Sequence, residues 1–139
     1  MTEFEREFFK KFNFTEEEIK RFFESVLHDL EIARKDPFPE VRFSYSFQAL
    51  IKAGIVLLGK TGKVKVRSIP GHHAMILKKM SEILKDTDIS AIGDAMRTKR
   101  NTGLYGGGAQ ISEKETDSYL KFVERVIQKV EKVVLRRVV

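Results

Sequence analysis

The chain has 139 residues, of which 42% are hydrophobic and 33% charged, so it has the size of one domain and enough apolar residues for a core. It contains no cysteine, which excludes a disulfide framework, a thiolate zinc site and a catalytic thiol. With no secretory signal and no apolar run near the roughly 20 residues that cross a bilayer, we expect one soluble, cytoplasmic domain over residues 1–139. Abundant Lys and Glu without Cys or Trp is a composition typical of a thermophilic source.

Charge is distributed unevenly along the chain. Residues 1–36 carry seven Lys and Arg against ten Asp and Glu, net −3, whereas residues 37–110 carry twelve against five, net +7. Residues 111–139 carry seven against five, net +2. The basic middle predicts a localised positive surface that can meet phosphate, although lysines with solvated head groups would give the same balance.

The first 60 residues predict mainly long helices. Thr15 and Glu18 form a capping box, and the apolar spacing that follows predicts a helix to about residue 35. A second helix over residues 41–58 is apolar around much of its circumference, as expected of the most buried helix, and Gly59 is expected to cap it. A separate short helix before them is suggested by four phenylalanines: Phe4, Phe8, Phe9 and Phe12.

The second half continues the helical pattern. Residues 60–71 predict a loop, because their short alternating stretch has no strand to pair with. Helices are expected over residues 72–84 and 89–99, followed by a break at the glycines of 103–108. Ser112 is expected to cap the last helix. The predicted fold is therefore all-α, an antiparallel up-and-down four-helix bundle with an extra short N-terminal helix.

The strongest candidate site lies at the end of the helix over residues 89–99. Arg97, Lys99 and Arg100 place three cations in four positions. Arg97 and Arg100 share a helix face with Asn101, and the planar guanidinium fork is suited to phosphate. Tyr105 follows on a glycine-rich segment that could bring its hydroxyl to the same pocket. The alternative is that these cations only complement the helix dipole, which leaves Asn101 and Tyr105 unexplained.

Paired histidines begin the helix over residues 72–84. At a helix start, His72 and His73 could bind phosphate or act as acid and base. Alternatively, His72 caps the helix and His73 packs against a neighbour. The sequence has no metal-ligand spacing, no phosphate-binding glycine loop and no dinucleotide fingerprint, so neither a metal nor a cofactor is expected.

The pattern resembles the HEPN family, small helical bundles named for nucleotide binding in higher eukaryotes and prokaryotes. The resemblance rests on the buried helix ending at Gly59, the start Gly71-His72-His73 and, above all, Arg100-Asn101 before Tyr105. HEPN ribonucleases that need no metal carry Arg, a polar residue and, a few positions later, His, where this chain has Tyr105. The resemblance implies an antiparallel bundle, a homodimer with the motif near its interface, and often a nucleotidyltransferase partner in a toxin–antitoxin pair.

Three functions follow as alternatives. The preferred one is binding of nucleotide or RNA phosphate as one half of a two-protein module with a nucleotidyltransferase. The second is a metal-independent ribonuclease, in which Arg100 stabilises phosphate charge and His72 or His73 supplies the base that a tyrosine with a pKa near 10 supplies poorly. The third is a non-catalytic interaction module that docks a partner on its phenylalanine-rich start. Whether the chain is an enzyme stays open at this point.

Overall fold

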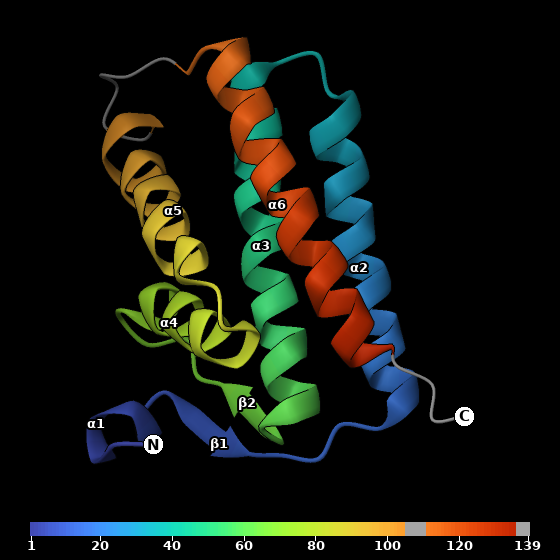
Figure 1. The fold of residues 1–139 in the computed structure, drawn as a ribbon, viewed down its shortest axis with the longest axis vertical. Helices are drawn as coiled ribbons and strands as arrows, with labels where there is room; N and C mark the ends of the chain where they lie inside the picture. The colour runs from blue at the N-terminus through green and yellow to red at the C-terminus, as the bar shows by residue number, and fades with distance from the viewer. Residues whose placement is uncertain (105–110, 136–139) are drawn as a thin grey trace.

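The computed structural model describes residues 1–104 and 111–135. Within these ranges the chain forms six α-helices, one π-helical turn and two short strands (Figure 1). The predominance of helix confirms the predicted class. The small sheet departs from the all-α prediction and occupies two segments that were expected to be helix and loop.

The body of the protein is built from the long helices α2 (Glu16–Lys35), α3 (Pro39–Thr61) and α6 (Glu113–Val134). α2 and α3 run in opposite directions, and α6 packs on α3 in the same direction as α3 (Figure 1). α2 and α6 begin at the predicted residues, because the hydroxyls of Thr15 and Ser112 each accept a backbone N–H from three residues further along. The boundaries of these long helices are thus set by local capping chemistry.

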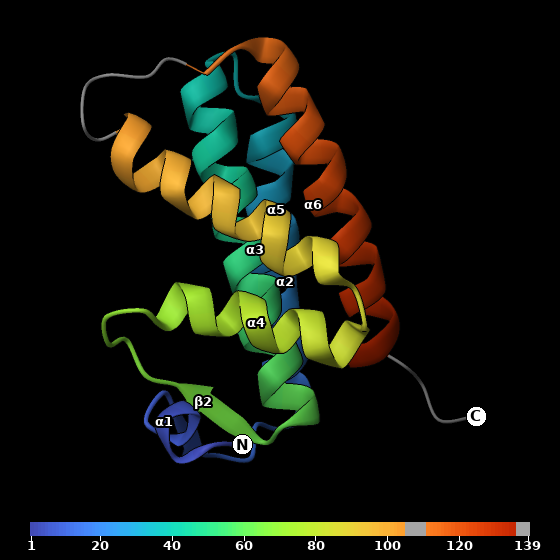
Figure 2. The ribbon, with the colours of Figure 1, turned by 60° about the vertical axis from the view of Figure 1, so that its left-hand side comes forward.

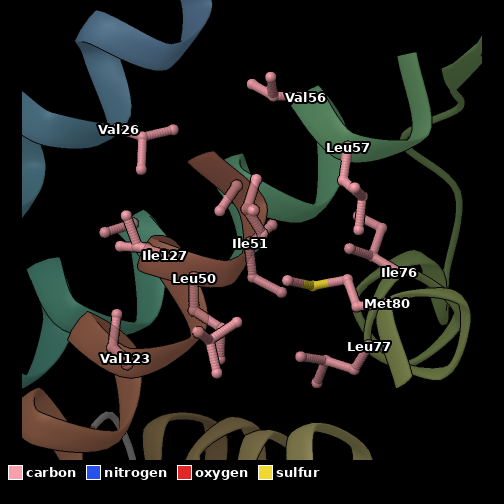
Figure 3. Close-up of a cluster of buried hydrophobic side chains, with 14 of the residues drawn as sticks. Val26, Leu50, Ile51, Val56, Leu57, Ile76, Leu77, Met80, Val123 and Ile127 are labelled. Atoms are coloured by element: carbon pink, nitrogen blue, oxygen red, sulfur yellow. The ribbon is translucent and has the colours of Figure 1, made fainter. Parts of the chain in front are cut away.

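α3 is the central helix of the core. By length and composition alone it could cross a membrane, but 61% of its most apolar window is buried inside the protein. It packs against α2, α4 and α6, so its broad apolar surface serves the core, as in a soluble protein. Figure 3 shows side chains of α3 meeting those of α2, α4 and α6 in this core: Val26, Leu50, Ile51, Val56, Leu57, Ile76, Leu77, Met80, Val123 and Ile127.

Gly59 does not cap α3, contrary to the prediction. The helix continues to Thr61, and the N–H of Gly62 closes it by donating to the Leu58 carbonyl at 2.8 Å. A Cβ on Gly59 would lie 2.9 Å from the ring of Phe14, so this glycine admits an aromatic ring to the helix surface. Close approach explains the glycine better than a helix end.

The N-terminal phenylalanine segment forms a short helix and a strand. α1 (Glu3–Arg6) ends early, and β1 (Phe9–Lys11) pairs antiparallel with β2 (Val64–Val66), with Phe9 opposite Val66. The prediction of a loop at residues 60–71 is therefore wrong over β2, since its partner lies in a segment with helical spacing of apolar residues. The fold itself covers much of this segment, because Phe8 and Phe9 are buried.

Two shorter helices pack beside α3. α4 (His72–Leu84) lies across the long helices, and α5 (Thr87–Thr98) rises from its end (Figure 2). α5 begins two residues earlier than predicted, because the Asp86 carboxylate accepts the Asp88 N–H at 3.1 Å. The predicted helix end at residue 99 is also displaced, because the π-helical turn η1 (Lys99–Leu104) continues α5; most of the predicted break at 103–108 lies outside the described residues.

Glycines allow α4 to approach both of its neighbours closely. A Cβ on Gly54 of α3 would lie 2.4 Å from Ile76 Cγ2, and one on Gly93 of α5 would lie 2.6 Å from Leu77 Cδ2. Both glycines are buried, and Ile76 and Leu77 are adjacent residues of α4. These contacts fix the position of α4, and with it the two histidines at its start.

Ion pairs hold α4 at its middle and just beyond its C-terminal end. The Asp86 carboxylate, just beyond the C-terminal end, accepts hydrogen bonds from Lys129 at 2.7 Å and Arg125 at 2.8 Å, and these bonds lower its pKa to about 2. Lys79 Nζ lies 2.7 Å from the buried carboxylate of Glu5, and this hydrogen bond holds the pKa of Glu5 well below its usual range. α4 is thereby tied to α6 and to α1.

Candidate functional site

The predicted histidines and arginines meet around a phenylalanine of α3. The Arg100 guanidinium carbon lies 5.5 Å from the ring centroid of Phe47, and the His73 ring lies 5.6 Å from the same centroid. The His72 and His73 rings lie 4.2 Å apart. Phe47 is only 1% exposed, so a rigid buried ring holds Arg100 and His73 at one place. We call His72, His73, Arg97 and Arg100 the basic cluster.

The pKa of His73 reflects its burial and the charges around it. Burial, followed by the charges of His72, Arg100 and Arg97, lowers the pKa of His73 to about 4. His73 is therefore uncharged at neutral pH, because protonation would add a positive charge beside existing ones. The arrangement concentrates positive potential at a partly exposed imidazole, which favours an anion there.

His72 is held in one tautomer. Its Nδ1 lies 2.8 Å from the Ile69 carbonyl oxygen, which can only accept, so Nδ1 carries the hydrogen of this bond. In the neutral ring Nε2 then has a lone pair that can accept a hydrogen bond or a proton. The loop before α4 thus orients an imidazole that can serve as a base or, when protonated, as a donor to phosphate.

The other predicted cations differ in their engagement. Arg97 Nε donates to Asp94 Oδ1 at 2.8 Å, and the Arg97 side chain keeps 31% of its surface exposed. Lys99 turns toward α6, where its Nζ lies 2.9 Å from Glu115 Oε2. Arg97 therefore belongs to the basic cluster, as its effect on His73 shows, whereas Lys99 serves as a link between η1 and α6.

Asn101 and Tyr105 complete the predicted set. Asn101 is exposed within η1, one residue after Arg100. Tyr105 lies outside the described residues. Because η1 is a π-helical turn, Arg100 and Asn101 do not continue the α-helical face of Arg97 that the sequence spacing implied. π-helical turns occur frequently at functional sites, so this departure marks the same segment that the motif does.

A surface groove borders the basic cluster. It lies between α4 and α5 and has a volume of about 510 Å³. Ala74, which follows His73, lines one side, and Asp94, which binds Arg97, lines the other. Ser81 and Ser90 add hydroxyls to its wall. No residue of the basic cluster lines the groove, and the acidic residues Glu82 and Asp94 line it together with Lys78.

Phe47 is the part of the site that sequence reasoning missed. Its spacing in α3 marks it as a core residue, and it is buried as that spacing predicts. Its contact with Arg100 and His73 depends on how α4 and α5 cross α3, which no local pattern encodes. An alternative weighed for His73 was packing against a neighbour, and the Phe47 ring is such a neighbour. His73 therefore packs against Phe47 and also lies near Arg100.

Comparison of this chain with protein-family models, with curated proteins and with solved structures finds no match.

Proposed function

We propose that this protein binds the phosphate of RNA or of a nucleotide at the basic cluster. The observation that carries the proposal is the uncharged, partly exposed His73 beside Arg97 and Arg100. A phosphate placed there would accept hydrogen bonds from guanidinium groups. It would also offset the charges that hold the pKa of His73 down, so we expect binding to be accompanied by proton uptake at His73.

The wider proposal follows the HEPN resemblance. The chain would be a helical bundle of HEPN type, a homodimer, and one half of a cytoplasmic toxin–antitoxin-like module with a nucleotidyltransferase. The composition adds a thermophilic source to this proposal. Support for these points is the sequence pattern around Arg100 and the helical fold; the basic cluster supports the phosphate-binding part directly.

RNA binding measured against salt tests the phosphate proposal. We expect a fluorescein-labelled single-stranded RNA to bind with an affinity that falls steeply as the salt concentration rises. The reason is that protein cations that contact RNA phosphates displace counterions from the RNA. Arg100→Gln should weaken binding about tenfold, the loss expected for one charge-assisted phosphate contact. Fluorescence anisotropy at several salt concentrations measures both effects.

Arg21→Gln is the matched control for Arg100→Gln. It removes the same charge from an exposed position of α2, and we expect it to change affinity less than twofold. Equal effects of the two substitutions would indicate non-specific attraction to a basic protein. Absence of RNA and nucleotide binding by the unmodified chain would contradict the proposal.

A metal-independent ribonuclease is the second candidate function, favoured by the fixed tautomer of His72 next to His73, which shares the Phe47 ring with Arg100. Such cleavage needs a base for the 2′-hydroxyl and an acid for the leaving group. If the chain cleaves an RNA pool in EDTA, His72→Asn should lower the rate at least about 100-fold, the usual contribution of acid–base catalysis. Asparagine can keep the hydrogen bond to Ile69 but cannot take a proton. An unchanged rate in His72→Asn would exclude His72 as the base.

The interaction-module alternative loses part of its basis in the fold. Of the phenylalanines expected to dock a partner, Phe8 and Phe9 are buried within this chain, while Phe4 is 63% exposed. Phe12 packs against Phe14 with ring centroids 4.6 Å apart. The phenylalanine-rich start therefore works mainly as part of the protein's own core.

A further inference from the structure

The solvent face of the small sheet brings like charges together. In the antiparallel register Lys10 of β1 stands directly opposite Lys65 of β2, and both are exposed. Side chains at such positions have Cβ atoms about 5 Å apart, and like charges there destabilise the sheet. Repulsion between Lys10 and Lys65 therefore destabilises the sheet at an exposed position, where neutral residues would not repel each other.

Further cations surround this pair, and carboxylates do not neutralise them. Lys65 Nζ lies 4.5 Å from the ring centroid of Phe12, a contact that holds its ammonium over the sheet. Glu18 is near enough for the Lys65 charge to contribute to lowering its pKa, but its carboxylate accepts the Thr15 N–H. In the part of the chain that the structure describes, no carboxylate lies within 4.0 Å of the exposed cations that we call the sheet cations: Lys10, Lys11, Lys63, Lys65 and Arg67.

Several cations elsewhere in the fold form ion pairs with carboxylates. Arg42, Lys52, Lys79, Arg125 and Lys129 each lie within 3 Å of a carboxylate oxygen. Among the described residues, exposed cations such as Lys121 and Lys132 of α6 also lack a carboxylate within 4.0 Å. The sheet cations differ from these by their gathering on one small sheet and by the facing pair of Lys10 and Lys65. The sheet cations are left available to an anion that the chain does not supply.

The sheet leads directly to the basic cluster. β2 is followed by residues 67–71, and His72 begins α4 immediately after them. Both views place β2, α4 and α5 in this order from the bottom of the molecule upward (Figures 1 and 2). The positive charges thus follow a path over these elements, with the Phe12 ring among them. Such a path suits a flexible single-stranded nucleic acid better than the flat anionic surface of a membrane.

We propose that the sheet cations form a second contact surface for single-stranded RNA, which extends the phosphate site of the basic cluster along the chain of the same RNA molecule. This inference rests on the proposed function and specifies its ligand: a single strand of several nucleotides and not a mononucleotide. A flexible single strand can follow cations on β1, β2, α5 and η1 past the imidazoles of α4 more readily than a rigid duplex can.

RNA length separates the two surfaces in the experiment. Anisotropy is measured with U5 and U20 for the unmodified chain, for Lys10→Ala/Lys65→Ala and for the control Lys121→Ala/Lys132→Ala, which removes two exposed lysines of α6. We expect the sheet variant to bind U20 about tenfold more weakly, with a salt slope reduced by about 1.4, and to bind U5 unchanged. The control should change U20 affinity less than twofold.

Folding is controlled within the same series. Removing the facing charges should change the melting temperature little, because the loss of like-charge repulsion offsets the loss of the contact between Lys65 and the Phe12 ring. Lys10→Glu is a second variant, expected to stabilise the sheet by facing Lys65 while still weakening U20 binding. A variant that keeps its U20 affinity in spite of this charge reversal would overturn the proposal.

The remaining outcomes distinguish this proposal from the proposed function. If the sheet variant matches its control while Arg100→Gln weakens U5 and U20, the sheet surface is overturned and the phosphate site stands. If Arg100→Gln has no effect while the sheet variant loses U20, the proposed site fails and the sheet surface stands. Loss of binding to phosphatidylserine vesicles with unchanged RNA affinity would assign the sheet cations to a membrane and overturn the proposal. Absence of RNA binding by the unmodified chain would overturn both.

Discussion

Phe47→Ala is expected to lower the free energy of unfolding by about 3–5 kcal/mol, the cost of deleting a fully buried phenylalanine. Phe47 is 1% exposed in the middle of α3, where the surrounding helices cannot close the cavity. The substitution also removes the ring that Arg100 and His73 share. We therefore expect a large loss of stability together with weaker RNA binding, measured by urea denaturation and by anisotropy under conditions where the variant stays folded.

Phe22→Ala is the matched control for this substitution. Phe22 of α2 is 41% exposed, so truncation removes less buried surface and should cost only about 1 kcal/mol. RNA affinity should be unchanged, because Phe22 packs on Phe14 rather than on the basic cluster. A cost for Phe47→Ala no larger than that for Phe22→Ala would contradict the central packing of the ring.

Gly54→Val is expected to lower the free energy of unfolding by about 2–3 kcal/mol, because a larger side chain cannot fit between α3 and α4. The Cβ alone would lie 2.4 Å from Ile76 Cγ2, a branched methyl with no freedom to withdraw, and 2.6 Å from Met80 Sδ. Relief requires α4 to move away from α3. Since His73 lies on α4, this movement should also separate it from Arg100 and raise its pKa.

Ser118→Val controls for the helix propensity of valine. Ser118 is exposed on α6, so a β-branched residue there should change stability by no more than about 0.5 kcal/mol. Thermal unfolding of the two variants measures the difference. Gly54→Val with stability equal to that of the unmodified chain would contradict the close approach of α3 and α4.

The sequence was most informative where local chemistry determines structure. The hydroxyls of Thr15 and Ser112 each satisfy a backbone N–H at a helix start, so both starts could be predicted from neighbouring residues. The apolar breadth of α3 likewise predicted its central burial. Gly59 shows where local prediction fails. A glycine near a helix end suggested a C-terminal cap, but this position needs a glycine because the ring of Phe14, distant in sequence, packs against it.

The remaining errors concern contacts between distant segments. β2 was assigned to a loop because its partner, β1, lies in a segment whose phenylalanines have helical spacing. The spacing of residues likewise identified Arg100 and His73 as separate candidates. It could not predict that both contact Phe47, because these contacts join segments that are distant in sequence. Tertiary packing decides both cases, since a strand needs a partner and a site needs the crossing of helices.

The pKa of His73 also sets a pH dependence of stability. Its value of about 4 in the folded chain lies below the ordinary value of about 6.5, so the unfolded chain binds more protons between these limits. Stability should therefore fall as pH falls from about 6.5 to 4. Bound phosphate should narrow the pH range over which stability changes, because it raises the pKa of His73 in the folded state toward its value in the unfolded chain.

The most direct test of the phosphate site is an NMR pH titration of the His73 imidazole, recorded for the chain alone, for Arg100→Gln and for the complex with U5. We expect His73 to titrate near pH 4 in the free chain. Its pKa should rise by a small amount when Arg100 is neutralised, because burial and the His72 charge also lower it, and should rise further when RNA is bound. A His73 that already titrates near its ordinary value, and does not respond to either change, would contradict a shared phosphate site.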